Sequence, residues 1–404
     1  MPTFVVIGGG HAAGQAVASL RQGGFDGEII VVGDEPFPPY QRPPLSKQYL
    51  SGEHGLDRVY LRPESFYAKR DITLKLGIRV ESLDCEAHSV TTSEGETINY
   101  DKALLCTGSR PRQLKAPGSD LAGIHYLRGI ADVDGIRAEM ADAKTMIIVG
   151  GGYIGLEVAA VVRTAGLEVS VLEMESRILN RVTTPTMSEF YTQLHEGRGV
   201  KILTDTAVSG FEGEGRISAA VTASGEQLPA DIVIIGIGIL PNVELAQAAG
   251  LDCENGIVVD ERCATSHPDV YAAGDCTNHP NPLLNRRLRL ESVPNAMEQS
   301  RVAAANMLGE EKTYAAIPWF WSDQYELKLQ MVGFSTDADQ EVLRGDPSSN
   351  QFARFYLEQG VLVAADAVNS PKEFMACRQL VTKQVKVDVD KLANADVPIK
   401  ELLA

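Results

Sequence analysis

Residues 3–13 read TFVVIGGGHAA and residues 145–155 read TMIIVGGGYIG, so the chain carries the same short pattern twice. In each copy an apolar, largely β-branched run favours a strand, and a glycine-rich turn leads from it into a segment of helical composition. Glycines in such a turn let the backbone reverse tightly and come close to a pyrophosphate. The two stretches predict two dinucleotide-binding α/β units of the Rossmann type.

The first copy contains the residues expected to hold one dinucleotide. Gly8 permits the tight turn, Gly10 lets the backbone approach the pyrophosphate, and Ala13 is a small residue in place of a third glycine. A second apolar run, residues 28–32, is followed by Asp34, which can accept hydrogen bonds from ribose hydroxyls. The pyrophosphate would lie at the helix N-terminus, where backbone N–H groups point outward.

The second copy has all three glycines, Gly150, Gly152 and Gly155, and the strand after its helix ends at Glu173. The Glu173 carboxylate would pair with the ribose hydroxyls of the second nucleotide and repel a 2′-phosphate. This residue therefore predicts NADH over NADPH. A duplicated scaffold that binds no nucleotide is the alternative interpretation of the repeat.

Three further apolar runs indicate strands of the same kind, and they end at Gly108, Gly238 and Asp275. A carboxylate at a strand end lies where open α/β sheets bind ligands, although a surface turn is the alternative for Asp275. The order of the strands predicts an α/β fold in which the second unit is inserted into the first. Beyond residue 319 the alternation becomes typical of antiparallel strands. The expected domains are residues 1–110 with 239–318, residues 111–238, and a C-terminal α+β domain over residues 319–404.

The composition excludes several classes of function. The 404 residues include 37 basic and 54 acidic side chains, and the net charge of −17 would repel nucleic acid and anionic membranes. Apolar runs such as residues 232–240 are much shorter than the roughly 20 residues that cross a bilayer, and the N-terminus lacks the pattern of a signal peptide. We expect a cytoplasmic protein that binds neither nucleic acid nor membrane. The six cysteines and seven histidines lack metal-ligand spacing, so no metal is expected.

Short segments spread over nearly the whole chain resemble the oxygenase-coupled ferredoxin reductases. Besides the two glycine-rich turns, they are PPLSK at residues 43–47, TG at 107–108, AAGD at 272–275, ESVPNA at 291–296 and PWFWSDQY at 318–325. The resemblance implies two Rossmann-like domains of the glutathione-reductase type plus a C-terminal α+β domain. It also implies an FAD protein that takes electrons from NADH and passes them singly to a [2Fe-2S] ferredoxin, which feeds a cytochrome P450 or a ring-hydroxylating dioxygenase.

The same resemblance assigns nucleotide contacts. The FAD pyrophosphate would meet Gly8, Gly10, Ala12 and Ala13, with Asp34 at the adenosine side. The other FAD contacts would be Lys47, Val80, Arg128, Asp275 and Val293. The NADH contacts would be Gly150, Gly152, Gly155, Glu173 and Gly238.

The resemblance further implies that four residues take part in electron transfer. Lys47 would place a positive charge beside the flavin and stabilise negative charge there in a dry site, and Glu157 matches the family's ion-pair partner for this lysine. A solvated loop lysine is the alternative. Trp319 and Trp321, the two tryptophans of the chain, would exclude water and shorten the electron path. Packing at a domain interface is the other interpretation of these rings.

Residues 41–49 contain no cysteine, whereas disulfide reductases of this fold carry a cysteine pair near the flavin. Electrons cannot pass to a dithiol at this place. They must leave for a bound organic acceptor, for oxygen, or for an external one-electron carrier.

A partner of opposite charge needs a basic surface on this acidic chain. Ferredoxins of this class are acidic, so a local cluster of arginines would attract one. Arg286, Arg287 and Arg289 are the docking residues that we expect. A solvated face or an internal salt-bridge set is the alternative.

Three other functions remain open. An NADH oxidase or peroxidase would need a reactive cysteine near the flavin, and Cys85 and Cys106 lie outside the PPLSK segment. A rubredoxin reductase would share many of the motifs, and a redox-sensing flavoprotein of the apoptosis-inducing-factor kind would be reduced slowly. The expected assembly is a monomer or a weak homodimer.

Overall fold

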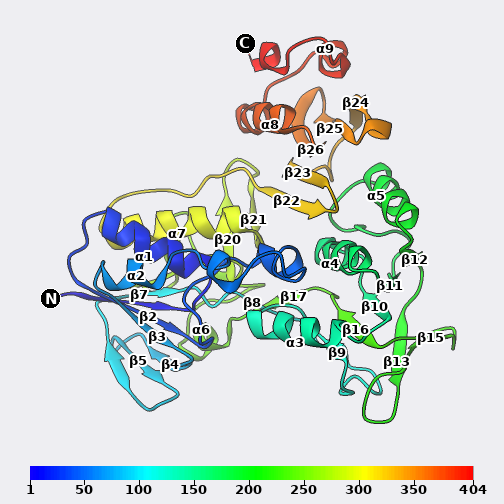
Figure 1. The fold of residues 1–404 in the computed structure, drawn as a ribbon. Helices are drawn as coiled ribbons and strands as arrows, with labels where there is room; N and C mark the ends of the chain where they lie inside the picture. Colours follow the sequence, from blue (N-terminus) through cyan, green and yellow to red (C-terminus); the bar gives the residue numbers. More distant parts are fainter. Residues whose placement is uncertain (404) are drawn as a thin grey trace. The chain divides into compact units, whose positions relative to one another are not determined.

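The computed structural model describes residues 1–403, which form two compact units (Figure 1). Unit 1 consists of residues 1–42, 55–110 and 240–318. Unit 2 consists of residues 43–54, 111–239 and the chain from residue 319 onward. The three-domain division expected from the sequence stays a prediction. In the structure, residues 43–54 belong to unit 2, and the expected NADH and C-terminal domains share that unit.

Unit 1 is built on a five-stranded parallel sheet that leads into the first glycine-rich turn. The strand order is β19-β7-β1-β2-β3, and every neighbouring pair is parallel. The strands are β1 (Thr3–Ile7), β2 (Glu28–Gly33), β3 (Ile72–Leu76), β7 (Lys102–Leu105) and β19 (Val270–Ala272). They are short and apolar because both faces of the sheet are covered, as in most parallel sheets.

Successive residues of β1 pack on opposite faces of this sheet. Phe4 and Val6 pack with residues of helices α1 and α7, which lie against each other (Figure 1). Val5 and Ile7 pack with residues of an antiparallel sheet and of α6. The elements of this unit outside the parallel sheet are α1 (His11–Gln22), α2 (Glu64–Ala68), β4 (Val80–Asp84), β5 (Ser89–Thr92), β6 (Thr97–Asn99), α6 (Glu244–Ala248), β18 (Ile257–Val258), β20 (Thr277–Asn281), β21 (Arg286–Leu288) and α7 (Val293–Met307).

Unit 2 contains a second five-stranded parallel sheet that leads into the second glycine-rich turn. Its order is β12-β11-β10-β16-β9. The strands are β9 (Ile124–His125), β10 (Thr145–Val149), β11 (Glu168–Leu172), β12 (Lys201–Leu203) and β16 (Ile232–Ile235). The accompanying elements are α3 (Ile130–Met140), α4 (Tyr153–Thr164), α5 (Pro185–Gly197), β13 (Val208–Glu212), β14 (Ala219–Thr222) and β15 (Gln227–Pro229). Short strands β8 (Ser109–Pro111) and β17 (Ile239–Pro241) lie where the chain passes from one unit to the other.

The rest of unit 2 is an antiparallel sheet with helix α8 packed on β23 and β26, which confirms the predicted antiparallel strands (Figure 1). The strand order is β22-β23-β26-β25-β24. The elements are β22 (Trp319–Gln324), β23 (Leu327–Gly333), β24 (Gln340–Asp346), β25 (Gln351–Glu358), β26 (Val361–Val368), α8 (Pro371–Lys383) and α9 (Val389–Ala393). No helix within residues 1–403 combines the length and the apolar character that a membrane span requires.

Candidate functional site

The first glycine-rich turn leaves space in front of helix α1. Gly8 has a φ of +119°, and a Cβ there would lie 2.2 Å from the carbonyl oxygen of Cys106, so only glycine fits. Gly10 precedes the helix, and a Cβ there would have no atom within 4 Å among the described residues. No side chain of residues 1–403 caps this helix at Gly10. The N-terminal turn is therefore suited to an anionic group such as a pyrophosphate.

Residues from the far end of unit 1 surround this turn. A Cβ on Gly274 would lie 3.3 Å from the Cβ of Ala12, so the two backbones are close together. The N–H of Gly274 donates to Oε1 of Gln299 at 2.8 Å, whereas Nε2 of Gln299 is buried without a partner among the described residues. The hydroxyl of Ser109 donates to Oδ2 of Asp275 at 2.9 Å. An unpartnered buried donor beside the open turn fits a ligand rich in acceptor oxygens, as FAD is.

The other predicted FAD contacts of unit 1 have ordinary local environments. Asp34 is exposed, and its Oδ2 lies 3.7 Å from Nη2 of Arg79. Val80 is buried in the core beneath the parallel sheet. Val293 is the first residue of α7, after the N-cap Ser292. Their roles as flavin contacts stay predictions.

A cluster at the end of β2 was not foreseen from the sequence. The hydroxyl of Tyr40 donates to Glu35, and the guanidinium of Arg42 pairs with the same carboxylate. Burial alone would lower the pKa of Arg42, but the charges of Tyr40, Glu35 and Asp275 outweigh burial and raise it. Arg42 therefore keeps a positive charge beside Glu35.

The second glycine-rich turn has the same architecture as the first. A Cβ on Gly150 would lie 2.4 Å from the oxygen of Gly236, and a Cβ on Gly155 would lie 2.3 Å from the oxygen of Gly150. Gly152 has open space around its Cβ direction, and no side chain within residues 1–403 caps helix α4 there. Oε2 of Glu173 accepts the N–H of Gly151 at 2.7 Å. The turn and its acid therefore fit a second dinucleotide with unphosphorylated ribose hydroxyls.

Two further predicted residues belong to the same unit. Gly238 has a φ of +103°, and its carbonyl accepts the N–H of Arg112 at 2.9 Å. Arg128 is half-buried just before α3, and its N–H donates to Oδ2 of Asp132 at 2.9 Å. Gly238 and Arg128 stay predicted nucleotide contacts.

Lys47 and Glu157 form the ion pair that the resemblance implies. Nζ of Lys47 lies 2.5 Å from Oε2 of Glu157, and the two residues are 8% and 1% exposed. The hydroxyl of Ser46 donates to the same Oε2 at 2.5 Å, and the hydroxyl of Ser322 donates to Oε1 at 2.7 Å. Three donors compensate the carboxylate for its removal from water. Lys47 is therefore not a solvated loop lysine.

The hydrogen bonds continue from Ser322 to residues that the sequence analysis did not single out. Nε2 of Gln324 donates to the Ser322 hydroxyl at 3.2 Å, and Oε1 of Gln324 lies 2.8 Å from Nε2 of His195. Burial lowers the pKa of His195 to about 4, so its ring is neutral at neutral pH. The sequence pattern that could have identified Ser322 and Gln324 is their alternation with Phe320 along one strand, which places polar side chains on a buried face.

Trp319 and Trp321 lie on the opposite face of the same strand and form an aromatic group. Their ring centroids are 5.7 Å apart, and the ring of Trp319 lies 5.6 Å from that of Phe374 in α8. The guanidinium of Arg378 lies 4.9 Å from the centre of the Trp319 ring. Both tryptophans are half-buried. This environment is compatible with packing and with an electron path, so their redox role stays a prediction.

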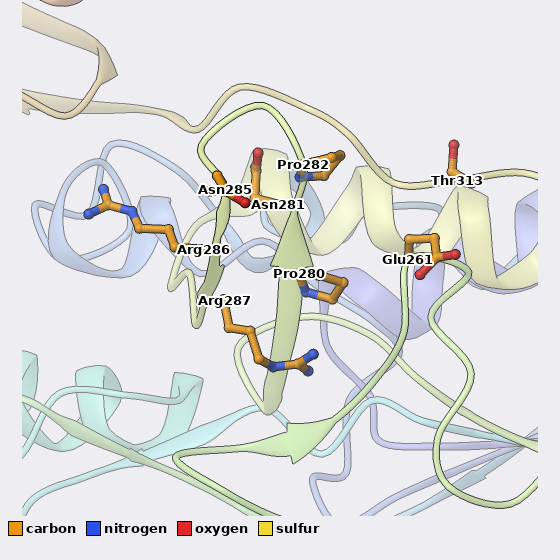
Figure 2. Close-up of a pocket in the computed structure, with 8 residues that line it drawn as sticks. All are labelled: Glu261, Pro280, Asn281, Pro282, Asn285, Arg286, Arg287 and Thr313. Carbon is orange, nitrogen blue, oxygen red and sulfur yellow. The ribbon is translucent and has the colours of Figure 1, made fainter.

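Two of the three predicted docking arginines, Arg287 and Arg289, form hydrogen bonds or ion pairs within unit 1. Arg287 donates to the carbonyls of Val259 and Asn278 at 2.8 and 2.5 Å, and Arg289 pairs with Glu291. Arg286 and Arg287 help to line a cavity of about 520 Å³, and their guanidinium groups point in different directions (Figure 2). For Arg287 and Arg289, these contacts fit the alternative of an internal hydrogen-bonded set.

The thiols of the chain offer no reactive partner for a flavin. All six cysteines are unpaired within the described residues 1–403. Cys106 packs behind Gly8, and burial raises the pKa of its thiol well above the ordinary value. No cluster of three or more His, Cys, Asp and Glu side chains suited to a metal ion occurs in the part of the chain that the structure describes.

Comparisons with known proteins cover nearly the whole chain. The family model described as pyridine nucleotide-disulphide oxidoreductase matches residues 2–300, and the model described as reductase C-terminal matches residues 319–403. The 5,5′-dehydrodivanillate O-demethylase ferredoxin reductase subunit of a Sphingobium species is 44% identical over 409 residues, covering 100% of this chain and 99% of the relative. A rubredoxin-NAD(+) reductase of Ectopseudomonas oleovorans is 35% identical over 370 residues, covering 91% and 96%. The solved structure of a covalent putidaredoxin reductase-putidaredoxin complex matches with a TM-score of 0.96 at 41% identity, covering 100% and 98%.

Proposed function

We propose that this chain, which belongs to the pyridine nucleotide-disulphide oxidoreductase family, carries electrons from NADH through FAD to a [2Fe-2S] ferredoxin, one at a time. The family confirms the expected fold class of two Rossmann-like domains with a C-terminal domain, and the expected cofactors FAD and a nicotinamide nucleotide. The observation that carries the proposal is that Lys47, in a segment without cysteines, forms a buried ion pair with Glu157. Electrons that cannot pass to a dithiol must leave by another route, and the likeness to ferredoxin reductases favours an external one-electron carrier.

The two glycine-rich turns perform the binding steps. The open position at Gly10 would receive the FAD pyrophosphate, and the one at Gly152 would receive that of NADH. Glu173 is held against its turn by the N–H of Gly151, so its carboxylate is fixed where ribose hydroxyls can donate to it. Bound FAD supplies the change from a two-electron donor to one-electron steps.

The Lys47 pair provides fixed electrostatics. An ammonium that is already desolvated and oriented by Glu157 stabilises negative charge developing beside it without reorganisation of water. We assign this role to Lys47, next to the flavin. Trp319 and Trp321 would shield the path of the departing electron from water, and the cation of Arg378 holds the first of these rings in place.

The partner is a ferredoxin, as in the putidaredoxin complex, and we propose that it is acidic and docks near Arg286, Arg287 and Arg289. Arg286 and Arg287 are exposed, and the carbonyl groups that Arg287 contacts are neutral, whereas Arg289 is paired with the Glu291 carboxylate, so Arg287 would contribute more of the attraction than Arg289. The terminal acceptor would be a cytochrome P450 or a ring-hydroxylating dioxygenase. We propose a monomer or a weak homodimer. Unpaired thiols within residues 1–403 favour a reducing compartment such as the cytoplasm.

Rubredoxin reduction is the second candidate function, favoured by the likeness to a rubredoxin-NAD(+) reductase over 91% of this chain. The test is anaerobic stopped-flow spectroscopy of the NADH-reduced protein mixed with a [2Fe-2S] ferredoxin or with a rubredoxin. Faster reduction of the ferredoxin supports the proposal, and faster reduction of the rubredoxin supports the alternative. Slow flavin reduction with a long-lived NAD complex would instead indicate the redox-sensing kind of protein.

A further inference from the structure

We propose that Ser322 and Gln324, on the first strand of the antiparallel sheet, are positioning residues that hold the Lys47 ammonium in place through Glu157. The inference rests on the proposed role of Lys47 and deepens it. It gives the C-terminal sheet a part in the reaction with NADH, in addition to any part in partner docking.

The geometry divides the donors between the two oxygens of the Glu157 carboxylate. Lys47 and Ser46 both donate to Oε2, at 2.5 Å each. Among the described residues, Ser322 is the donor to Oε1, at 2.7 Å. Because Glu157 is 1% exposed, water cannot readily replace that donor. Without the hydroxyl, the carboxylate can rotate about its terminal bond, and the Lys47 ammonium loses its fixed direction.

Gln324 decides which way the Ser322 hydroxyl points. A serine hydroxyl has a single hydrogen, which it can direct to only one acceptor. The amide of Gln324 is oriented with Oε1 toward His195 and Nε2 toward Ser322, so the neutral ring of His195 donates from Nε2 to Oε1 in the tautomer that this orientation requires. The Ser322 oxygen then accepts from Gln324, and its hydrogen is left for Glu157. All three hydrogen bonds of this chain thus run in one direction, toward the carboxylate.

The pattern of the strand supports a specific role for these side chains. Ser322 and Gln324 are fully buried polar residues on one face of β22, and Asp323 between them, like Trp321 before them, belongs to the other face. Ser322 is 165 residues from Glu157 in the sequence, so the contact depends on the packing of β22 against α4. A buried polar pair would otherwise be replaced by apolar residues without loss of packing. Its presence indicates a role in orienting the ion pair.

The test is the variant Ser322→Ala in the FAD-loaded protein. We expect the limiting rate of flavin reduction at saturating NADH to fall about tenfold, since one hydrogen bond to a charged group is lost. The dissociation constant of NADH should stay within about twofold, because the second glycine-rich turn is unchanged. The flavin midpoint potential should shift to a lower value. The matched control is Ser188→Ala, which removes another buried serine of unit 2, whose hydroxyl donates to the carbonyl of Ile178 and accepts from Arg177 rather than from a residue of this network.

A second readout does not depend on turnover. Acylation of lysines by acetic anhydride, mapped by mass spectrometry against the exposed Lys312, reports how firmly the Lys47 ammonium is held. We expect Lys47 to react several-fold faster in Ser322→Ala than in the parent or in Ser188→Ala. If Ser322→Ala does not accumulate as a folded flavoprotein, Gln324→Met tests the same chain of hydrogen bonds, with an expected loss of about threefold in the limiting rate.

The outcomes separate this inference from the proposed function. If Lys47→Met slows flavin reduction but Ser322→Ala and Gln324→Met behave like Ser188→Ala in rate, potential and labelling, the positioning role is wrong and the function stands. If Lys47→Met itself has no effect, the role of Lys47 fails. If the parent protein does not reduce a ferredoxin, the proposed function fails whatever the variants show.

Discussion

The N–H of Gly151 donates a 2.7 Å hydrogen bond to Oε2 of Glu173, so the acid that follows β11 is fixed against the second glycine-rich turn. The other carboxylate oxygen accepts the N–H of Glu175 at 2.9 Å. Both contacts use backbone donors. Each carboxylate oxygen therefore keeps a lone pair that can accept a hydrogen bond from a ribose hydroxyl. The position of this charge leads to the first prediction.

Replacing Glu173 should weaken the choice of NADH over NADPH. Glu173→Arg removes the charge that repels a 2′-phosphate and adds one that attracts it, so the ratio of kcat/KM for NADH to that for NADPH should fall about tenfold or more. Glu168→Ala, at the exposed start of the same strand, is the control and should leave the ratio unchanged. An equal ratio in Glu173→Arg and the parent would refute this account of the residue.

Substituting valine at the two open glycine positions should show which turn binds FAD and which binds NADH. A Cβ at Gly10 or at Gly152 meets no atom within 4 Å in the described chain, and both backbones are extended, so each position accepts a β-carbon without strain. Gly10→Val should yield a folded, colourless protein, and Gly152→Val a yellow one whose KM for NADH is raised at least about tenfold. Circular dichroism and the visible spectrum give the result. Normal FAD content in Gly10→Val would place the flavin elsewhere.

Removing the Lys47 charge should slow the transfer of electrons from NADH and lower the flavin potential. Lys47→Met keeps the length of the side chain, and we expect the limiting rate to fall about tenfold or more. The variant also leaves Glu157 buried without its cation, so its melting temperature must be measured alongside. An unchanged rate and potential in a stable variant would show that the assigned electrostatic role is mistaken.

Substitution of the tryptophans should affect the natural partner more than a small oxidant. Trp319→Leu and Trp321→Leu should slow reduction of a [2Fe-2S] ferredoxin more than reduction of ferricyanide, because the small oxidant needs no docked path. Phe374→Leu removes a ring that packs on Trp319 and serves as the packing control. Equal slowing with both acceptors would indicate that the rings have only a packing role.

Asp366 should make the stability of unit 2 depend on pH. Burial raises the pKa of this carboxyl from 3.8 to about 6, against the opposing hydrogen bonds from Thr183 and Tyr356. The folded state therefore binds the proton of this carboxyl more tightly than the unfolded state does. The resulting stabilisation of the folded state is fully present below about pH 4 and is lost as pH rises through about 6. Asp366→Asn has no carboxyl to ionise, so it should avoid a decrease of up to about 3 kcal/mol in the free energy of unfolding between low and high pH. Melting temperatures between pH 4.5 and 7.5 should rise relative to the parent toward the higher pH, and parallel curves would contradict the assignment.

The glycine-rich turns could be predicted because their requirement is local. Gly8 and Gly150 have positive φ and lie too close to a neighbouring carbonyl for any Cβ, and apolar strands precede both turns. Helix α1 begins at His11, directly after Gly10, because the end of the glycine turn is already its N-terminus. Element boundaries at such turns depend on backbone geometry that composition does not encode.

The hydrogen-bond partners could not be predicted, because they are distant in the sequence. Ser322 meets Glu157 across 165 positions, and nothing in the strand pattern names its acceptor. Two of the internal partners of Arg287 are backbone carbonyls, which leave no trace in residue type. The grouping of residues 43–54 with unit 2 likewise follows from tertiary packing alone.

The most direct test of the central claim is a visible spectrum of the purified protein during anaerobic titration with NADH, followed by addition of oxidised [2Fe-2S] ferredoxin. We expect a yellow protein whose flavin bands bleach with about one equivalent of NADH and return with about two equivalents of ferredoxin. A colourless protein that does not take up FAD on reconstitution, or a bleached flavin that the ferredoxin leaves reduced, would contradict the account.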